Sequence, residues 1–200
     1  MEARVKTGEE RRAIHEEFRH VDEAFREGDM DALRAALGNP DDFPNTLLPL
    51  ASFGPGGDCL EYAIYHSPLP FIRALLEVGA DPNPPDHVHI GFPPLIAALS
   101  CVRSVPGSTA RRDATEILAL LLSFGADPNQ RGLNDWTALH MAAAQYSPDA
   151  IRILLEGGAD PALRTRIDEC LTAREEAERA GLREIAELLA AAETGRRGAP

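Results

Sequence analysis

The sequence predicts an all-α solenoid of about five helix pairs, organised as one domain over residues 1–200. A short motif, Leu-Leu followed by Gly-Ala-Asp-Pro, occurs three times, at 75–82, 121–128 and 154–161. Gly125 and Gly158 lie 33 residues apart, whereas Gly79 and Gly125 lie 46 apart, which indicates one repeat period plus an insertion. Aromatic residues make up only 6% of the chain, so small aliphatic side chains must fill the core.

The repeated motif describes the end of a helix and the start of a turn. Its two leucines close an apolar helix face, and the glycine supplies the left-handed residue that ends a helix without a Cβ clash. The Asp-Pro pair then stops any continuation, because proline disfavours the α conformation in the residue before it. We therefore expect a positive φ at Gly125.

The first helix pair is predicted over residues 9–40, as an N-terminal capping repeat. Apolar residues recur at steps of three and four, which is typical of one helical face, and they are Ile14, Phe18, Val21 and Phe25. Gly28 breaks this helix, and Asp29 or Asp31 is suited to cap a short second one.

Residues 41–57 are predicted to form a long loop because they are rich in proline and glycine. The apolar residues inside it are expected to fold back onto the stack, and they are Leu47, Leu48, Leu50 and Phe53. The alternative is an exposed docking patch.

Two central repeats follow, over residues 58–85 and 86–131. Asp58 and Glu61 have the spacing of a capping box, which predicts a helix start there. The next repeat is predicted to begin near Pro93 and to hold an inter-helix insertion at 102–109. Ser108 or Thr109 is the expected cap of a helix that runs to residue 124.

The third central repeat is predicted over residues 132–163, with helices at 136–143 and 149–157. A C-terminal capping repeat is expected over 164–192, where Thr172 and Glu175 have capping-box spacing and Gly181 forms the turn between helices. Residues 195–200 are expected to be a tail.

The segment 137–140, Thr-Ala-Leu-His, resembles the ankyrin repeat, as do the Gly-Ala-Asp-Pro turns and the 33-residue spacing. The resemblance extends from about residue 9 to 192. It implies that each repeat forms two antiparallel helices and a protruding turn, and that His140 belongs to a network fixing the turn. Tyr146 replaces the usual glycine between helices. Arg174 and Glu176 replace apolar residues, which suits a C-terminal cap.

The resemblance also implies a concave binding surface made by the turns and the first helix of each pair. Family members generally bind other proteins there. The variable contact positions are occupied in this chain by Phe92, Leu133, Asp135, Trp136 and Tyr146. Trp136 and Tyr146 are typical binding anchors, because aromatic side chains with a polar edge are frequent hot spots.

The composition limits the classes of partner. A net charge of −12 argues against nucleic acid or an anionic membrane surface and favours a protein partner. Three widely spaced cysteines predict neither a disulfide framework nor a zinc site, and they suit a reducing cytoplasm. We expect a cytoplasmic monomer without cofactor, signal peptide or membrane-spanning segment.

Two groups of residues offer alternative chemistry. His87 and His89 alternate in a turn and form a metal candidate with Asp86 or His66, although a partner-contacting turn is the favoured interpretation. Asn83 and Asn129 occupy the position where some ankyrin proteins are hydroxylated. The favoured interpretation is that their side chains tie the turn to neighbouring backbone.

The predicted function is a non-catalytic scaffold for protein–protein interaction. The first alternative is a dedicated inhibitor or immunity-type partner of a single enzyme or toxin, since acidic charge steers association with a basic target. The second is a substrate of an asparagine hydroxylase at Asn83 or Asn129. The third is an enzyme that uses the long loop or the histidine pair, although phosphate-loop and hydrolase motifs are missing from the sequence.

Overall fold

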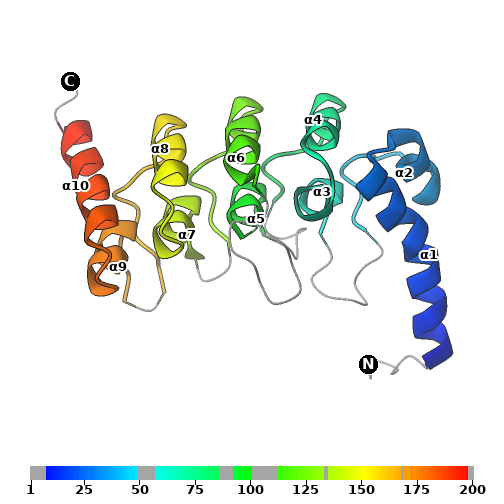
Figure 1. Cartoon of the computed structure of the whole chain (residues 1–200), viewed down its shortest axis with the longest axis horizontal. Helices are drawn as coiled ribbons and strands as arrows, with labels where there is room; N and C mark the ends of the chain where they lie inside the picture. Colours follow the sequence, from blue (N-terminus) through cyan, green and yellow to red (C-terminus); the bar gives the residue numbers. More distant parts are fainter. Residues whose placement is uncertain are drawn as a thin grey trace. The chain divides into compact units, whose positions relative to one another are not determined.

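The computed structural model describes residues 8–48, 57–85, 92–100, 112–132, 135–167 and 169–197. These residues form ten α-helices, which fall into two compact units, Met1–Ala80 and Asp81–Pro200 (Figure 1). The all-α class is therefore confirmed. The single domain over residues 1–200 stays a prediction.

The first unit contains two helix pairs. Helix α1 (Gly8–Glu27) packs against α2 (Met30–Ala36) and α3 (Cys59–His66), and α3 packs against α4 (Leu69–Glu77). Asp29 caps α2, since its Oδ1 accepts a hydrogen bond of 2.9 Å from the backbone N–H of Ala32. Asp58 caps α3 in the same way through the N–H of Glu61, at 2.8 Å. Both caps satisfy donors that a helix start leaves unpaired.

The second unit contains three helix pairs, α5 (Pro94–Ser100) with α6 (Ala114–Ser123), α7 (Ala138–Ala144) with α8 (Pro148–Glu156), and α9 (Ala173–Arg179) with α10 (Arg183–Arg197). The first helices contact one another in the order α5, α7, α9, and α8 contacts both α6 and α10. The core between them is aliphatic. Its fully buried side chains include Leu99, Ile117, Leu118, Leu121 and Leu139.

The repeated motif ends its helices as predicted. Gly79, Gly125 and Gly158 have φ of 103°, 86° and 95°, in the left-handed region that glycine adopts without strain. In each copy the alanine N–H reaches back to the first leucine carbonyl, for example from Ala126 to Leu121 at 3.0 Å. This contact satisfies a carbonyl that the helix end would otherwise leave unpaired.

Asparagine side chains join successive turns. Asn83 donates to the carbonyl of Gly125 at 2.8 Å and accepts from the N–H of Asp127 at 2.6 Å. Asn129 makes the same pair of contacts with Gly158 and Asp160, at 3.4 and 2.8 Å. The prediction that these amides tie each turn to neighbouring backbone is confirmed. Asn45, which lies in the predicted loop, donates to the Gly79 carbonyl at 3.0 Å.

The predicted loop over residues 41–57 is described only in part. Leu48 is buried, as expected, whereas Leu47 is 46% exposed and does not fold into the core. Leu50 and Phe53 lie outside the described residues, as do Ser108, Thr109 and the rest of the 102–109 insertion.

Two helix boundaries differ from the prediction. Helix α6 begins at Ala114 with Asp113 as its N-cap, so neither Ser108 nor Thr109 caps it. Helix α10 continues through Gly195 to Arg197, where a tail from residue 195 was expected. The Glu193 carboxylate binds the Arg174 guanidinium at 3.0 Å, and this ion pair links the last part of α10 to α9. Within the described ranges, no helix has the length and apolar character needed to cross a membrane.

Candidate functional site

The turn before α7 contains three of the residues predicted to bind a partner, namely Leu133, Asp135 and Trp136. The N–H of Gly132 donates to the Trp136 carbonyl at 2.8 Å, which closes the turn into a hairpin. A Cβ at Gly132 would lie 2.7 Å from Cδ1 of Ile96, so a larger residue there would force this side chain of α5 to move. Leu133 lies outside the described residues.

Asp135 is at the centre of an ion-pair network. Its carboxylate binds Arg131 at 2.6 Å within the turn and Arg166 in the following turn, also at 2.6 Å. The backbone N–H of Arg166 also donates to it. The hydrogen bonds from Arg166 lower the pKa of Asp135, and its side chain is only 8% exposed. Asp135 therefore fixes the turn and offers little surface to a partner.

His140 provides a second tie between these two turns, as the family resemblance implied. The backbone N–H of Thr137 donates to Nδ1 at 3.3 Å, so Nδ1 is an acceptor and the proton of the neutral ring lies on Nε2. Nε2 then donates to the carbonyl of Leu171 at 3.2 Å. Burial lowers the pKa of His140, which favours this neutral form.

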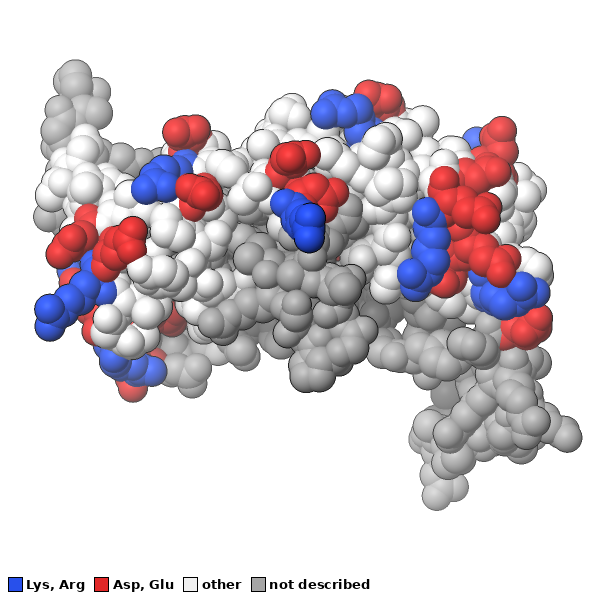
Figure 2. Space-filling view, in the orientation of Figure 1, with Lys and Arg blue, Asp and Glu red and all other residues white. Residues whose placement is uncertain are grey.

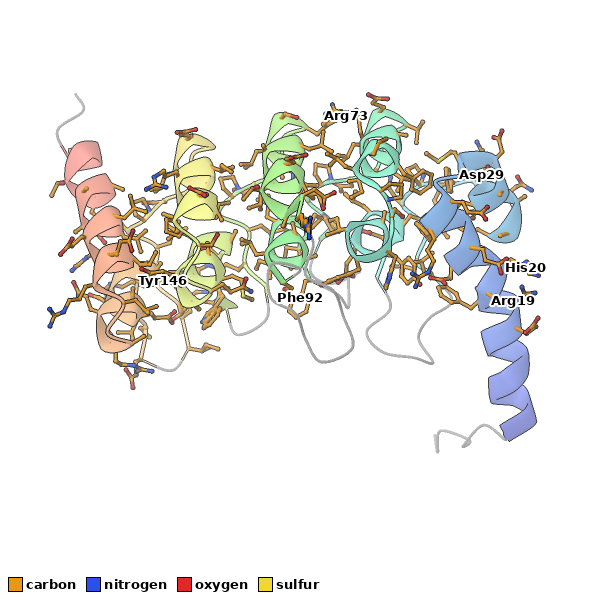
Figure 3. The ribbon with its side chains drawn as sticks, viewed as in Figure 1. Arg19, His20, Asp29, Arg73, Phe92 and Tyr146 are labelled. Carbon is orange, nitrogen blue, oxygen red and sulfur yellow. The ribbon has the colours of Figure 1, made fainter. Side chains whose placement is uncertain are left out.

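The bulky residues of three successive turns occupy the same position. Phe92, Trp136 and Leu171 each lie two residues before a first helix, namely α5, α7 and α9, and each is half-buried. Because these helices contact one another in that order, the three side chains belong to adjacent turns. We call Phe92, Trp136 and Leu171 the hairpin row. Figure 3 labels Phe92 just before α5.

Tyr146 lies at the opposite end of α7 from Trp136 (Figure 3). It adopts φ of 53°, a left-handed conformation, and its side chain is 48% exposed. Glycine fills the equivalent inter-helix turn at Gly28, with φ of 73°, and at Gly181, with φ of 74°. The Tyr146 hydroxyl donates to the Glu184 carboxylate on α10.

Sequence reasoning missed Arg131, Arg166 and Leu171, and also Ile167, which is 44% exposed in the last turn. The spacing of Arg131 and Asp135 was a usable signal, since residues four apart in a turn can pair. The contact between Asp135 and Arg166 spans 31 residues and depends on the register between repeats.

The described residues offer little support for catalytic chemistry. Among them, no group of three His, Cys, Asp or Glu side chains is placed to hold a metal ion, and His87 and His89 lie outside the described ranges. Burial raises the pKa of Cys59 to about 12, so this thiol is protonated at neutral pH.

A cavity of about 330 Å³ lies in the last pair. Four of its charged lining residues pair with one another, Arg164 with Glu175 and Arg174 with Glu193. An incoming ion would have to displace one of these partners.

Comparison with known proteins identifies related sequences. Residues 108–197 match the family model of ankyrin repeats, in three copies. The chain is 36% identical over 72 residues to Protein fem-1 homolog C of Danio rerio, covering 34% of this chain and 11% of that protein. It is 43% identical over 51 residues to a putative ankyrin repeat-containing protein of Treponema pallidum (strain Nichols), covering 26% and 17%.

A further relative is Protein phosphatase 1 regulatory subunit 27 of Mus musculus, 44% identical over 45 residues, covering 22% of this chain and 29% of that protein. The chain thus spans less than a third of the length of each of these relatives.

Proposed function

We propose that this chain, which is an ankyrin-repeat protein, works as a non-catalytic scaffold that binds another protein through the second unit. Ankyrin repeats generally mediate protein–protein interaction. The observation that carries the proposal is the hairpin row: Phe92, Trp136 and Leu171 present bulky apolar side chains at the same position of three adjacent turns. Half-buried aromatic side chains on a rigid support are favoured binding anchors.

The support of the hairpin row is fixed before any partner arrives. Asp135 and His140 both tie the Trp136 turn to the following turn, through Arg166 and Leu171. A surface that is already ordered loses less conformational entropy on binding, so more of its contact energy contributes to affinity. Tyr146 extends the proposed surface to the other end of α7.

The charge of the chain narrows the partner class further. A net charge of −12 repels nucleic acid and anionic lipid and accelerates encounter with basic proteins. We propose that the partner is a protein and that the chain acts in the cytoplasm as a monomer.

A second candidate function is that of a dedicated regulator of one enzyme. The name of Protein phosphatase 1 regulatory subunit 27, a relative over 45 residues, favours this alternative. An inhibitor of a basic enzyme or toxin would also profit from the acidic charge.

The two candidates differ in the number of partners that they predict. Affinity capture from the source cells with the wild-type chain and with Trp136→Ala, run in parallel, tests both. A scaffold recovers several proteins and a regulator recovers one enzyme. In either case Trp136→Ala should fail to capture the proteins that the wild-type chain captures. Partners that are retained equally by both chains would contradict the proposed surface.

A further inference from the structure

The first unit gathers its aromatic side chains in one cluster that runs from the core to the surface. Phe25 and Phe71 are buried, with ring centroids 6.1 Å apart, and Phe25 lies 4.7 Å from Tyr62. Beyond Tyr62 the rings continue outward on α1 and α3. We call this set the aromatic cluster, and its members are Phe18, Phe25, Tyr62, Tyr65, His66 and Phe71.

The outer part of the aromatic cluster is accessible to solvent. Tyr62 contacts Phe18 at 5.4 Å and His66 at 4.2 Å between ring centroids, and Tyr65 lies 6.2 Å from His66. Phe18, Tyr62 and Tyr65 are half-buried, and His66 is exposed. The buried rings of Phe25 and Phe71 already fill the space between the helices. The outer rings therefore form a polar-edged aromatic surface of the kind enriched at protein interfaces.

The net charge of the first unit is negative. Residues 1–80 carry 15 acidic and 8 basic side chains, which gives −7 of the net −12. Figure 2 shows acidic side chains gathered over α1 and α2, with fewer basic ones among them. The Asp22 carboxylate accepts from Tyr62 at 2.7 Å and also pairs with Arg26 at 2.8 Å. Arg19 and His20 lie on the side of α1 away from α3 in Figure 3.

The same unit already holds an arginine against an aromatic ring. The guanidinium carbon of Arg34 lies 5.5 Å from the ring centroid of Phe43. A planar guanidinium stacks on aromatic faces and pairs with carboxylates, whereas an ammonium does so less well because it is compact and strongly hydrated.

We propose that the outer rings of the aromatic cluster bind an arginine side chain presented by a basic segment of a protein partner. The guanidinium stacks on the rings of Tyr65 and His66, in the negative field of the first unit. This surface lies on α1 and α3 and is independent of the hairpin row, so it adds a second contact to the proposed function.

The test uses the full chain and three peptides, in which glycine alternates with arginine, lysine or glutamate. Isothermal titration calorimetry measures the affinity of each peptide. The arginine peptide should bind at least about fivefold more tightly than the lysine peptide, and the glutamate peptide should not bind. Tyr65→Ala should weaken arginine binding about fivefold, and Tyr65→Phe should retain it. Asp31→Asn, which removes an exposed α2 carboxylate, should change it less than twofold, and Trp136→Ala should leave it unchanged.

Circular dichroism establishes that each variant is folded. Three outcomes would overturn the proposal: equal affinity for the arginine and lysine peptides, unchanged arginine binding in folded Tyr65→Ala, or no binding of any peptide. A loss in Trp136→Ala equal to that in Tyr65→Ala would instead assign the peptide to the hairpin row.

Discussion

The turn before α7 and the turn after it hold their aromatic residues in opposite ways. Trp136 belongs to a turn in which Asp135 binds two arginines, Arg131 and Arg166, and in which His140 reaches the next turn. Tyr146 sits in a left-handed conformation with φ of 53° and is 48% exposed. Asp135 is also left-handed, with φ of 60°, but aspartate tolerates this conformation better than tyrosine does, and its turn is held by the ion pairs.

The two turns have different requirements. In the turn before α7, the ion pairs of Asp135 and the contact of His140 help to fix the register between repeats. An inter-helix turn needs only a left-handed residue, which Gly28 and Gly181 supply at no steric cost. A tyrosine there costs about 1–2 kcal/mol, and such strain is typical of functional positions. We infer that stability does not explain Tyr146.

The largest expected effect is the loss of the network in front of α7. Asp135→Ala leaves Arg131 and Arg166 without their shared carboxylate and should lower the free energy of unfolding by about 2–3 kcal/mol. Chemical denaturation measures this change. Asp149→Ala is the matched control, because its pair with Arg152 is exposed and should contribute less than about 0.5 kcal/mol. Equal losses of unfolding free energy in Asp135→Ala and Asp149→Ala would show that the network contributes no more to stability than an exposed ion pair does.

Left-handed strain can be calibrated at Gly125, where φ is 86° and a Cβ would meet no atom within 4 Å. Gly125→Val should lower the free energy of unfolding by about 1–2 kcal/mol through backbone strain alone. Gly195→Ala, inside α10 and equally uncrowded, should raise it by about 0.5–1 kcal/mol, because alanine is the better helix former. An unchanged denaturation midpoint for Gly125→Val would contradict the calibration.

The His140 contact makes stability depend on pH. Burial lowers the pKa of His140 below its ordinary value of about 6.5, so the unfolded chain binds more protons than the folded one below that pH. Stability is therefore complete above about pH 6.5 and falls as the pH decreases, by at most about 1.4 kcal/mol per pH unit. The pKa values of Asp135 and Glu175 are also lowered, but these carboxylates reduce the stability only below about pH 4, where they become protonated.

Thermal unfolding between pH 5 and 7.5 checks this dependence. His140→Gln should be less stable at pH 7.5 and should show a smaller loss of stability towards pH 5. An identical slope in the wild type and the variant would assign the pH dependence to other groups.

A smaller effect on stability is expected in the turn after α7. Tyr146→Gly relieves the left-handed strain but loses the contact with Glu184, so the free energy of unfolding should rise by about 0.5–1 kcal/mol at most. Partner affinity should nevertheless fall. Tyr146→Phe, which keeps the ring and loses the hydroxyl, separates the two contributions. Marked destabilisation by Tyr146→Gly would assign a structural role to the tyrosine.

The sequence predicted the features that depend on local chemistry. The left-handed glycines and the Thr172–Glu175 capping box follow from residues close together in the sequence. The asparagine ties join successive turns, but the repeated Gly-Ala-Asp-Pro-Asn motif indicated them. The contact of Asn45 was not predicted, because Asn45 follows Phe43-Pro44 and the Gly-Ala-Asp of the repeated motif does not precede it. Its contact with Gly79 nevertheless places it in the same role.

The features that were not predicted depend on how one repeat packs on the next. The family resemblance implied that Asp135 is a partner contact, and this stays a prediction. Its pairing with Arg166, which comes from the following turn, could not be read from the sequence. The extension of α10 to Arg197 likewise depends on the long-range pair between Arg174 and Glu193. Pattern reasoning along the chain cannot supply such contacts.

We infer that Trp136 serves binding more than folding. This is tested by measuring the affinity of Trp136→Ala for the purified partner and its free energy of unfolding. We expect an affinity loss of about 2 kcal/mol or more, with the free energy of unfolding within about 0.5 kcal/mol of the wild type. A lower free energy of unfolding with nearly unchanged affinity would show that the tryptophan only stiffens its turn and is not a binding anchor.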